Sequence, residues 1–364
     1  MAKLSIAEDY GREAQPMPAD TRVVSVRLPR RPDLLPTKTS SLRWVVIEAP
    51  RRCYVPRVLE QNGLAGYEPD ALACFLAAAT VAQHGAIWDI GANIGIYGLL
   101  ARALGDRPVR AFEPTPELAL LAEGIAEDNA LPYPVERIAL GAVAGEAAFY
   151  LSDVTDSSNS LAAGFRPSSR TLTVTVDTID AVVDRTDEVP AVLKIDTEST
   201  EPDVLLGADR LVREHRPWIL CEVLAGRSEA ALMDVLAPWN YHWFHITGTS
   251  PLTETTRIEG DPTYMYMMWL FAPEPPMAEF WSLQRAWLEE IRTCLPVSTG
   301  TATTSSDSRL RHELAAVRAR LANLEKSGTM EAGRIVADVM QHPLHGVRSA
   351  PRRLYRLWRR RRAR

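Results

Sequence analysis

Short apolar runs alternate with helix-like segments through the middle of the chain, from about residue 68 onward. Apolar runs of this length separated by helical patterns are typical of βαβ units and a parallel sheet. The pattern predicts strands near residues 86–89, 109–113, 135–140, 191–196, 218–222, 241–246 and 264–271. It predicts helices near 70–83, 95–104, 116–129, 202–215 and 228–237. The expected fold is α/β, with a doubly wound, mostly parallel seven-stranded sheet.

Two segments depart from this alternation. Between the third and fourth strands, EAAFYL and the alternating TLTVTVDTI predict an inserted or edge β segment, where a substrate loop could lie. The last two strands follow a single helix and are aromatic (YHWFHI and YMYMMWLF), which indicates an antiparallel pair at one edge of the sheet.

The flanking segments predict the domain organisation. Residues 1–65 are proline-rich and are expected to form an N-terminal extension on a main domain that spans 66–272. Residues 273–297 predict a helix, which is followed by a Ser/Thr-rich linker at 298–308 and a helical appendage at 309–342. A heptad stripe of about two repeats covers 309–326, so docking on a domain and self-association are both open. The chain ends in a basic tail at 343–364.

Composition limits the class of protein. A chain of 364 residues with 46% apolar and 24% charged content can bury a sizeable core. The four cysteines form no C-x-x-C pair, which favours a reducing, cytoplasmic setting. We expect no membrane-spanning segment, because the longest apolar stretch, Ala71–Ala82, is too short to cross a bilayer.

The net charge of −5 hides an asymmetry between the body and the tail. Residues 348–364 hold nine arginines and no acid, which leaves 32 basic against 46 acidic residues elsewhere. An acidic body argues against nucleic acid as the main substrate. The tail mixes its arginines with Leu354, Tyr355, Leu357 and Trp358. Peripheral contact with the inner face of a membrane and a solvated basic end are therefore both open.

The stretch AIWDIGANIGIYGLLAR, residues 86–102, predicts a strand, a glycine turn and a helix that together bind a cofactor. Gly91 and Gly95 would let the backbone turn tightly and approach a ligand. The spacing G-x-N-x-G-x-x-G departs from the dinucleotide G-x-G-x-x-G pattern, and Asp89 stands directly before it. A carboxylate there would repel a pyrophosphate, but it suits the cationic amino group of S-adenosylmethionine (SAM).

Three more predicted strands end in acids: Glu113 after VRAF, Asp196 after AVLKI and Glu222 after WILC. Glu113 is well placed to accept hydrogen bonds from two ribose hydroxyls. In a doubly wound sheet these strand tips lie along one rim, so we expect the acids to share a site. Any single one could instead cap the next helix or turn.

The order WDIGANIG, AFEPTP, VDTIDAV, LKIDTESTEPDVLLGA and RPWILCEV resembles the FkbM-type SAM-dependent methyltransferases, across roughly residues 66–272. The resemblance implies a class I, Rossmann-like methyltransferase fold and methyl transfer to a hydroxyl, on a sugar, a glycan or a polyketide-like natural product. The cofactor-binding residues expected on this basis are Asp89, Gly91, Ala92, Asn93, Gly95, Glu113 and Pro114.

One position departs from the pattern of that family. Where the family reads K-I-D-V-E-G-x-E, this chain reads K-I-D-T-E-S-T-E from Lys194 to Glu201, so Ser199 replaces a glycine. If that position has a positive φ, Ser199 strains the turn by about 1 kcal/mol. Lys194, inside an apolar strand, is expected to pair with a carboxylate.

Methyl transfer to an alcohol calls for a general base or a metal ion. Asp196 is the first candidate base and Glu198 and Glu222 follow, or all three could hold a hard cation such as magnesium. Glu198 and Glu201 could instead only cap the helix at 202–215. The acceptor pocket is expected to be built from residues 150–175 and the N-terminal extension. The alternatives are a nicotinamide-dependent oxidoreductase, disfavoured by Asp89 and Asn93, and a catalytically silent cofactor-binding scaffold.

Overall fold

The computed structural model describes residues 20–30 and 42–297, and the fold is given for these residues. The predictions for the linker at 298–308, the appendage at 309–342 and the basic tail at 343–364 lie outside the described residues, together with the contacts expected of them. In the described ranges, none of the helices combines the length and the hydropathy needed to cross a bilayer.

An eight-stranded sheet lies at the centre, in the order β12-β11-β13-β10-β9-β3-β4-β5. Five neighbouring strands run parallel: β3 (Ala86–Ile90), β4 (Val109–Phe112), β5 (Val135–Glu136), β9 (Pro190–Ile195) and β10 (Trp218–Glu222). At the other edge the pairs are antiparallel, through β11 (His242–His245), β12 (Glu254–Thr255) and β13 (Met268–Ala272). The doubly wound, mostly parallel sheet with an antiparallel edge is confirmed. The two-residue strand β12 is an eighth strand, too short for an apolar pattern to reveal.

The parallel strands are apolar because both of their faces are covered. Every residue of β3 and of β9 is buried. Ile87 packs into one core cluster, whereas its neighbour Trp88 packs into the cluster on the opposite face. Parallel strands between two helical layers therefore show continuous apolar runs instead of alternation.

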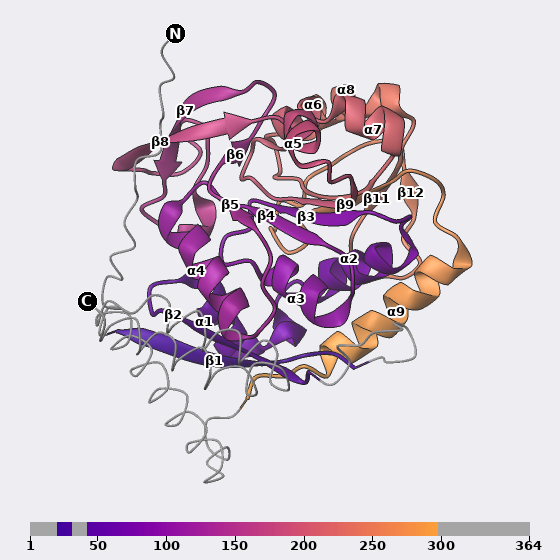
Figure 1. Ribbon diagram of the computed structural model, residues 1–364. Helices are drawn as coiled ribbons and strands as arrows, with labels where there is room; N and C mark the ends of the chain where they lie inside the picture. The colour runs from indigo at the N-terminus through magenta and orange to yellow at the C-terminus, as the bar shows by residue number, and fades with distance from the viewer. Residues whose placement is uncertain (1–19, 31–41, 298–364) are drawn as a thin grey trace, which may run out of the picture. The chain divides into compact units, whose positions relative to one another are not determined.

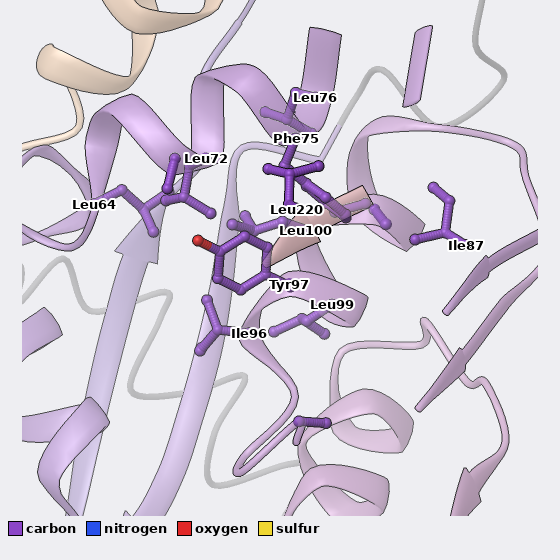
Figure 2. Close-up of a cluster of buried hydrophobic side chains, with 14 of the residues drawn as sticks. Leu64, Leu72, Phe75, Leu76, Ile87, Ile96, Tyr97, Leu99, Leu100 and Leu220 are labelled. Carbon is purple, nitrogen blue, oxygen red and sulfur yellow. The ribbon is translucent and has the colours of Figure 1, made fainter. Parts of the chain in front are cut away.

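Helices cover both faces of the sheet (Figure 1). One layer contains α2 (Pro69–Val81), α3 (Ile96–Leu104), α4 (Pro116–Asp128) and α9 (Ala278–Arg292). The other contains α5 (Ile179–Thr186), α6 (Glu201–Leu206), α7 (Asp209–His215) and α8 (Glu229–Leu236), which the 3₁₀ turn η3 (Ala237–Trp239) follows. Figure 2 shows the core cluster that contains Ile87, in which the rings of Phe75 and Tyr97 meet edge to face with centroids 5.1 Å apart.

Two smaller β-sheets accompany the central sheet and its two helical layers. The insertion between β5 and β9 forms a three-stranded sheet in the order β6-β8-β7, from β6 (Ala139–Leu140), β7 (Gly145–Leu151) and β8 (Arg170–Asp177), with the 3₁₀ turn η2 (Asp156–Ser158) between β7 and β8. This confirms the predicted inserted β segment. Near the N-terminus, β1 (Thr21–Arg27) and β2 (Trp44–Pro50) pair antiparallel, and α1 (Tyr54–Asn62) and η1 (Leu64–Gly66) follow.

The helices differ from the sequence prediction in three places. Neither α1 nor α5 was predicted, because α1 lies in a proline-rich segment and α5 follows directly on the alternating pattern of β8. The single helix expected at 202–215 is broken into α6 and α7 at Gly207. A Cβ on Gly207 would lie 2.2 Å from the carbonyl oxygen of Gly141, so the inserted sheet approaches the bare backbone there.

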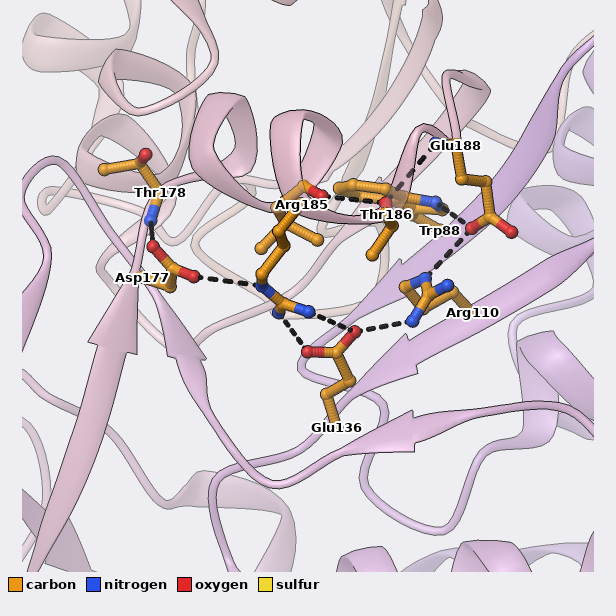
Figure 3. Close-up of polar contacts among 9 residues, drawn as sticks. Trp88, Arg110, Glu136, Asp177, Thr178, Arg185, Thr186 and Glu188 are labelled. Atoms are coloured by element: carbon orange, nitrogen blue, oxygen red, sulfur yellow. Dashed lines mark hydrogen bonds and ion pairs between the residues drawn. The ribbon is translucent and has the colours of Figure 1, made fainter. Parts of the chain in front are cut away.

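A charged network joins the sheet to α5 (Figure 3). Arg110 on β4 lies 2.6 Å from Glu136 and 3.0 Å from Glu188, and Glu188 also accepts a hydrogen bond from the Trp88 indole at 2.8 Å. Arg185 on α5 pairs with the same Glu136. Arg185 also lies 3.4 Å from Asp177, the last residue of β8. Because Arg110, Glu136 and Glu188 are mostly buried, the network fixes α5 and the inserted sheet against the strands.

Candidate active site

A cavity of about 710 Å³ opens at the carboxyl ends of β3, β4, β9 and β10. Doubly wound α/β proteins bind their ligands at this edge of the sheet. The volume lies within the ~300–1,000 Å³ that is typical of small-molecule sites. Three of the acids predicted at strand tips, Glu113, Asp196 and Glu222, line this cavity. Most of the predicted rim of carboxylates therefore surrounds one space.

The turn after β3 makes one wall, through Gly91, Ala92 and Asn93. Gly91 has a φ of +73°, and a Cβ there would lie 1.8 Å from the carbonyl oxygen of Asp196, so only glycine fits. All five amide N–H groups from Gly91 to Gly95 donate within the chain, to Phe112, Glu113, Ala92 or Asn93. A dinucleotide loop needs free N–H groups for the pyrophosphate. The geometry therefore disfavours the nicotinamide-dependent alternative.

Gly95 has a different role from the one predicted. It lies outside the cavity lining, and a Cβ on it would lie 2.4 Å from the phenol oxygen of Tyr133. That phenol donates a hydrogen bond to the Gly95 carbonyl at 2.9 Å. The bare backbone at Gly95 makes room for Tyr133 and not for a ligand.

Asp89 also lies away from the cavity lining, buried beneath the turn with 1% of its surface exposed. Its Oδ2 accepts a hydrogen bond from the Gly98 amide at 3.0 Å, and Lys194 Nζ lies 3.5 Å from its Oδ1. The register of β3 and β9 places Asp89 directly opposite Lys194, so the two charges meet beneath the cavity. Burial raises the pKa of Asp89, and Lys194 and the Gly98 amide oppose that rise. The predicted direct contact between Asp89 and a cofactor does not fit this geometry.

The expected pairing of Lys194 with carboxylates is confirmed. Its Nζ lies 3.2 Å from Asp196 and 3.3 Å from the Gly91 carbonyl oxygen. Burial alone would lower the pKa of Lys194, but the charges of Asp196 and Asp89 outweigh it and raise the pKa above its usual value. Lys194 is therefore a charged cross-link between the turn after β3 and the end of β9.

Glu113 lines the cavity and is 5% exposed. Its Oε2 accepts a hydrogen bond from the Asn93 amide and its Oε1 accepts one from the Thr115 amide, each at 2.8 Å. Burial raises the pKa of Glu113 to about 7, and hydrogen bonds from Thr115 and Asn93 oppose the rise. Because a carboxylate oxygen offers two lone pairs, each oxygen can still accept a bond from a ligand. Pro114, which follows it, also lines the cavity.

Asp196, Glu198 and Glu222 form the carboxylate cluster, in which one oxygen from each residue lies within 4.8 Å of the other two. Burial raises the pKa of Glu198 to about 9, with further increases from the negative charges of Asp196 and Glu201. Burial and the charge of Asp196 hold the pKa of Glu222 well above its usual range. The structure therefore brings the three predicted catalytic residues together.

The turn that carries Glu198 is shaped by Glu201. The φ of Glu198 is +59° and that of Ser199 is +87°, which confirms the positive φ anticipated for Ser199. Glu201 is fully buried, and its Oε1 accepts hydrogen bonds from the amides of Thr197 at 2.9 Å and Ser199 at 3.2 Å. Glu201 thus holds the turn in place, whereas Glu198 lines the cavity.

Comparison with known families adds to this geometry. Residues 89–242 match the family model of the methyltransferase FkbM domain. The similarity to the FkbM methyltransferase domain thus covers 154 of the 364 residues, from 89 to 242. The match begins at the buried Asp89 and ends at β11, so it includes the turn after β3, Glu113 and the carboxylate cluster.

Similar solved structures include a methyltransferase FkbM from Methylobacillus flagellatus, at 19% identity and a TM-score of 0.35, with 52% of this chain and 43% of that chain covered. A precorrin-6y C5,15-methyltransferase from Geobacter metallireducens shares 10% identity over 55% of this chain and 86% of its own, at a TM-score of 0.33. A SAM-dependent methyltransferase from Agrobacterium tumefaciens shares 8% identity over 63% of this chain and 68% of its own, at a TM-score of 0.34. The chain thus spans less than half of the FkbM relative. A search of curated proteins found no match.

Further parts of the cavity wall come from the two segments that were expected to build the acceptor pocket, and others from residues 264–268, which lead into β13. The insertion contributes Asp156 and Arg166, and α1 contributes Tyr54. The side-chain amide of Asn93 donates a hydrogen bond to the backbone carbonyl of Asp156 at 3.1 Å, and the Ser160 hydroxyl donates one to the backbone carbonyl of Glu198 at 2.5 Å. The insertion therefore contacts both the turn after β3 and the carboxylate cluster.

Sequence reasoning named none of three further acids that line the cavity: Glu68, Asp70 and Asp156. Glu68 lines it, has a φ of +46° and accepts a hydrogen bond from the Tyr97 phenol at 2.8 Å. Burial raises the pKa of Glu68, with a further increase from the charge of Asp196. The available signal was the pair Glu68–Pro69 at the start of α2, which reads as an ordinary helix start.

Proposed function

We propose that this FkbM domain uses SAM to methylate a hydroxyl group of a sugar, a glycan or a polyketide-like natural product. The observation that carries the proposal is the shared cavity, in which Glu113 and the turn after β3 face the carboxylate cluster. One side is suited to a nucleoside and the other to proton removal. A methyl donor and an alcohol acceptor would need both.

The side formed by Gly91 to Asn93 and Glu113 fits the donor. Glu113 keeps free lone pairs for two ribose hydroxyls, and the bare Gly91 lets a ligand approach the backbone. SAM carries a sulfonium and an ammonium group, and the cavity lining includes the carboxyl groups of Glu68 and Asp156. Acidic walls favour such a cationic ligand over a pyrophosphate.

The carboxylate cluster fits the acceptor. Bound SAM supplies an electrophilic methyl group, so that the O–C bond forms as the S–C bond breaks and its electron pair returns to sulfur. The acceptor hydroxyl must lose its proton during this step, and an oxygen of Asp196, Glu198 or Glu222 can take it. A divalent cation such as Mg²⁺, held by the same residues, could instead acidify the hydroxyl.

Alignment comes from groups that hold the two sides at a fixed spacing. Lys194 bonds to Gly91 on the donor side and pairs with Asp196 on the acceptor side. Glu201 fixes the turn that carries Glu198. In-line displacement depends strongly on such positioning, which can supply up to ~7–11 kcal/mol of the barrier.

Titration calorimetry with SAM tests the donor side. We expect Glu113→Gln to weaken SAM binding about 10- to 100-fold, because a hydrogen bond to a charged group contributes ~1.5–3 kcal/mol. The exposed Glu146 on β7 provides the matched control, and Glu146→Gln should bind SAM like the wild type. Failure of the wild-type chain to bind SAM would contradict the proposal.

Transfer of a labelled methyl group tests the acceptor side. The panel should pair hydroxyl acceptors, such as sugars, glycans and polyketide-like alcohols, with amine analogues. We expect methylation of a hydroxyl, and Asp196→Asn should abolish it while leaving SAM affinity within about twofold. Transfer to the amines alone would overturn O-methylation, and SAM binding without any transfer would favour a catalytically silent scaffold.

A further inference from the structure

The carboxylate cluster has the dimensions of a cation site. Its three residues come from two neighbouring strands, because Asp196 and Glu198 follow β9 and Glu222 ends β10. Hard divalent cations bind oxygens at ~2.0–2.6 Å, so two oxygens on opposite sides of one ion lie roughly 4–5 Å apart. One oxygen from each residue falls within 4.8 Å of the other two, which meets that limit without any rearrangement of the backbone.

Glu222 indicates independently that a partner is missing. Its side chain is 4% exposed, and its Oε2 has no hydrogen-bond partner among the described residues. The basic residues in the cavity lining are Lys194 and Arg166. Lys194 is engaged by Asp89 and Asp196, and within the described residues no ion pair joins either basic residue to Glu222. A buried carboxyl group that lacks a partner costs ~1–3 kcal/mol or more, so such groups are normally satisfied. Glu222 lines the cavity, and a ligand there would satisfy it.

Protonation alone does not satisfy this carboxyl group. A protonated Glu222 would still need an acceptor for its O–H, and within residues 20–30 and 42–297 its Oε2 has neither a donor nor an acceptor. A cation would bond to Glu222 directly and would also offset the repulsion between the three acids. The donors are all carboxylate oxygens, which suit Mg²⁺ or Mn²⁺ better than Zn²⁺.

We propose that Asp196, Glu198 and Glu222 bind one hard divalent cation of the Mg²⁺ or Mn²⁺ type. Its role rests on the proposed function: the ion would hold the acceptor oxygen beside the methyl donor and would favour loss of the hydroxyl proton. An acceptor with two adjacent oxygens, such as a vicinal diol of a sugar, would replace two waters of the ion at once. The site therefore selects acceptors that chelate.

Titration of the full chain with Mn²⁺, followed by the electron paramagnetic resonance signal of the free ion, tests the site without catalysis. We expect one saturable Mn²⁺ site per chain, from which added Mg²⁺ displaces the ion. Glu222→Gln should weaken Mn²⁺ binding at least about tenfold. Glu198→Gln, at a less buried position, should do the same and covers the case in which Glu222→Gln does not fold. Glu146→Gln, outside the cavity, should bind Mn²⁺ like the wild type.

The outcomes separate this inference from the proposed function. If Mn²⁺ does not bind, or binds equally to the wild type and both cluster variants, the cation site is refuted. If SAM binds in the same preparation, the proposed function survives that result. If Mn²⁺ binds at the cluster while SAM does not bind, the cation site stands and the proposed function fails.

Discussion

Replacement of Ser199 by glycine should stabilise the protein. Ser199 has a φ of +87°, a region in which a residue with a Cβ is strained by roughly 1–2 kcal/mol relative to glycine. Its Oγ is buried and has no hydrogen-bond partner among the described residues, which costs about 1 kcal/mol or more. Both costs disappear in Ser199→Gly.

One opposing effect must be subtracted. Glycine gives the unfolded chain more freedom, which lowers stability by about 0.4–1 kcal/mol. The expected net change is therefore a gain of about 1–2 kcal/mol in the free energy of unfolding. The amide of Ser199 still donates to Glu201 in the variant, because a substitution to glycine keeps the N–H group.

Equilibrium unfolding in urea measures this gain as a higher midpoint with an unchanged slope. Ser168→Gly is the matched control, because Ser168 lies in the insertion and has no positive φ. This control carries only the unfolded-state cost and should lose about 0.4–1 kcal/mol. If Ser199→Gly loses as much stability as Ser168→Gly, the turn is not strained and the reasoning is wrong.

Three further predictions concern Glu113 and Gly95. The pKa of Glu113 is raised from 4.5 to about 7. SAM affinity should therefore fall as the pH drops below about 7, because the ionised carboxylate is the form that accepts hydrogen bonds from both ribose hydroxyls. In calorimetry, Glu113→Gln should lose this pH dependence of SAM affinity. The unfolded chain loses this proton first, so the unfolding free energy of the wild type should also fall more steeply than that of Glu113→Gln as the pH rises from about 4.5 to 7. Gly95→Ala should lose about 2–4 kcal/mol through its φ of +77° and its overlap with Tyr133. Adding Tyr133→Phe should recover about 1 kcal/mol of that loss in urea unfolding, whereas strict additivity would contradict the assigned overlap.

The sheet was predictable because its signals are local. Every residue of β3 and β9 is buried, so each strand appears in the sequence as an apolar run with a single charged residue, Asp89 in β3 and Lys194 in β9. Glu113 and Asp196 followed from their places at strand ends, since parallel strands bring such ends to one edge. These residues could therefore be predicted from the order of strands along the chain, without knowledge of side-chain packing.

The predicted roles that the geometry does not favour, those of Asp89 and Gly95, depend on contacts between distant segments. Asp89 was expected to contact a cofactor because nothing near it in the sequence shows that Lys194 lies opposite it on β9. Gly95 was expected to face a ligand, but the Tyr133 phenol, 38 residues further along, occupies the space beside it. In both cases the sequence identified an unusual residue, but it did not reveal the distant residue that contacts it.

The junction between the two sides of the cavity is the part of the site with least freedom. A Cβ on Gly91 would overlap the Asp196 carbonyl at 1.8 Å, and Lys194 joins the same two residues through an ion pair and a hydrogen bond. The turn after β3 and the carboxylate cluster are therefore held together, with backbone in contact with backbone. In the proposed methyl transfer this contact would set the distance between methyl carbon and acceptor oxygen, and a misplacement of about 1 Å can cost ~10²-fold in rate. Any side chain at position 91 would displace both sides at once.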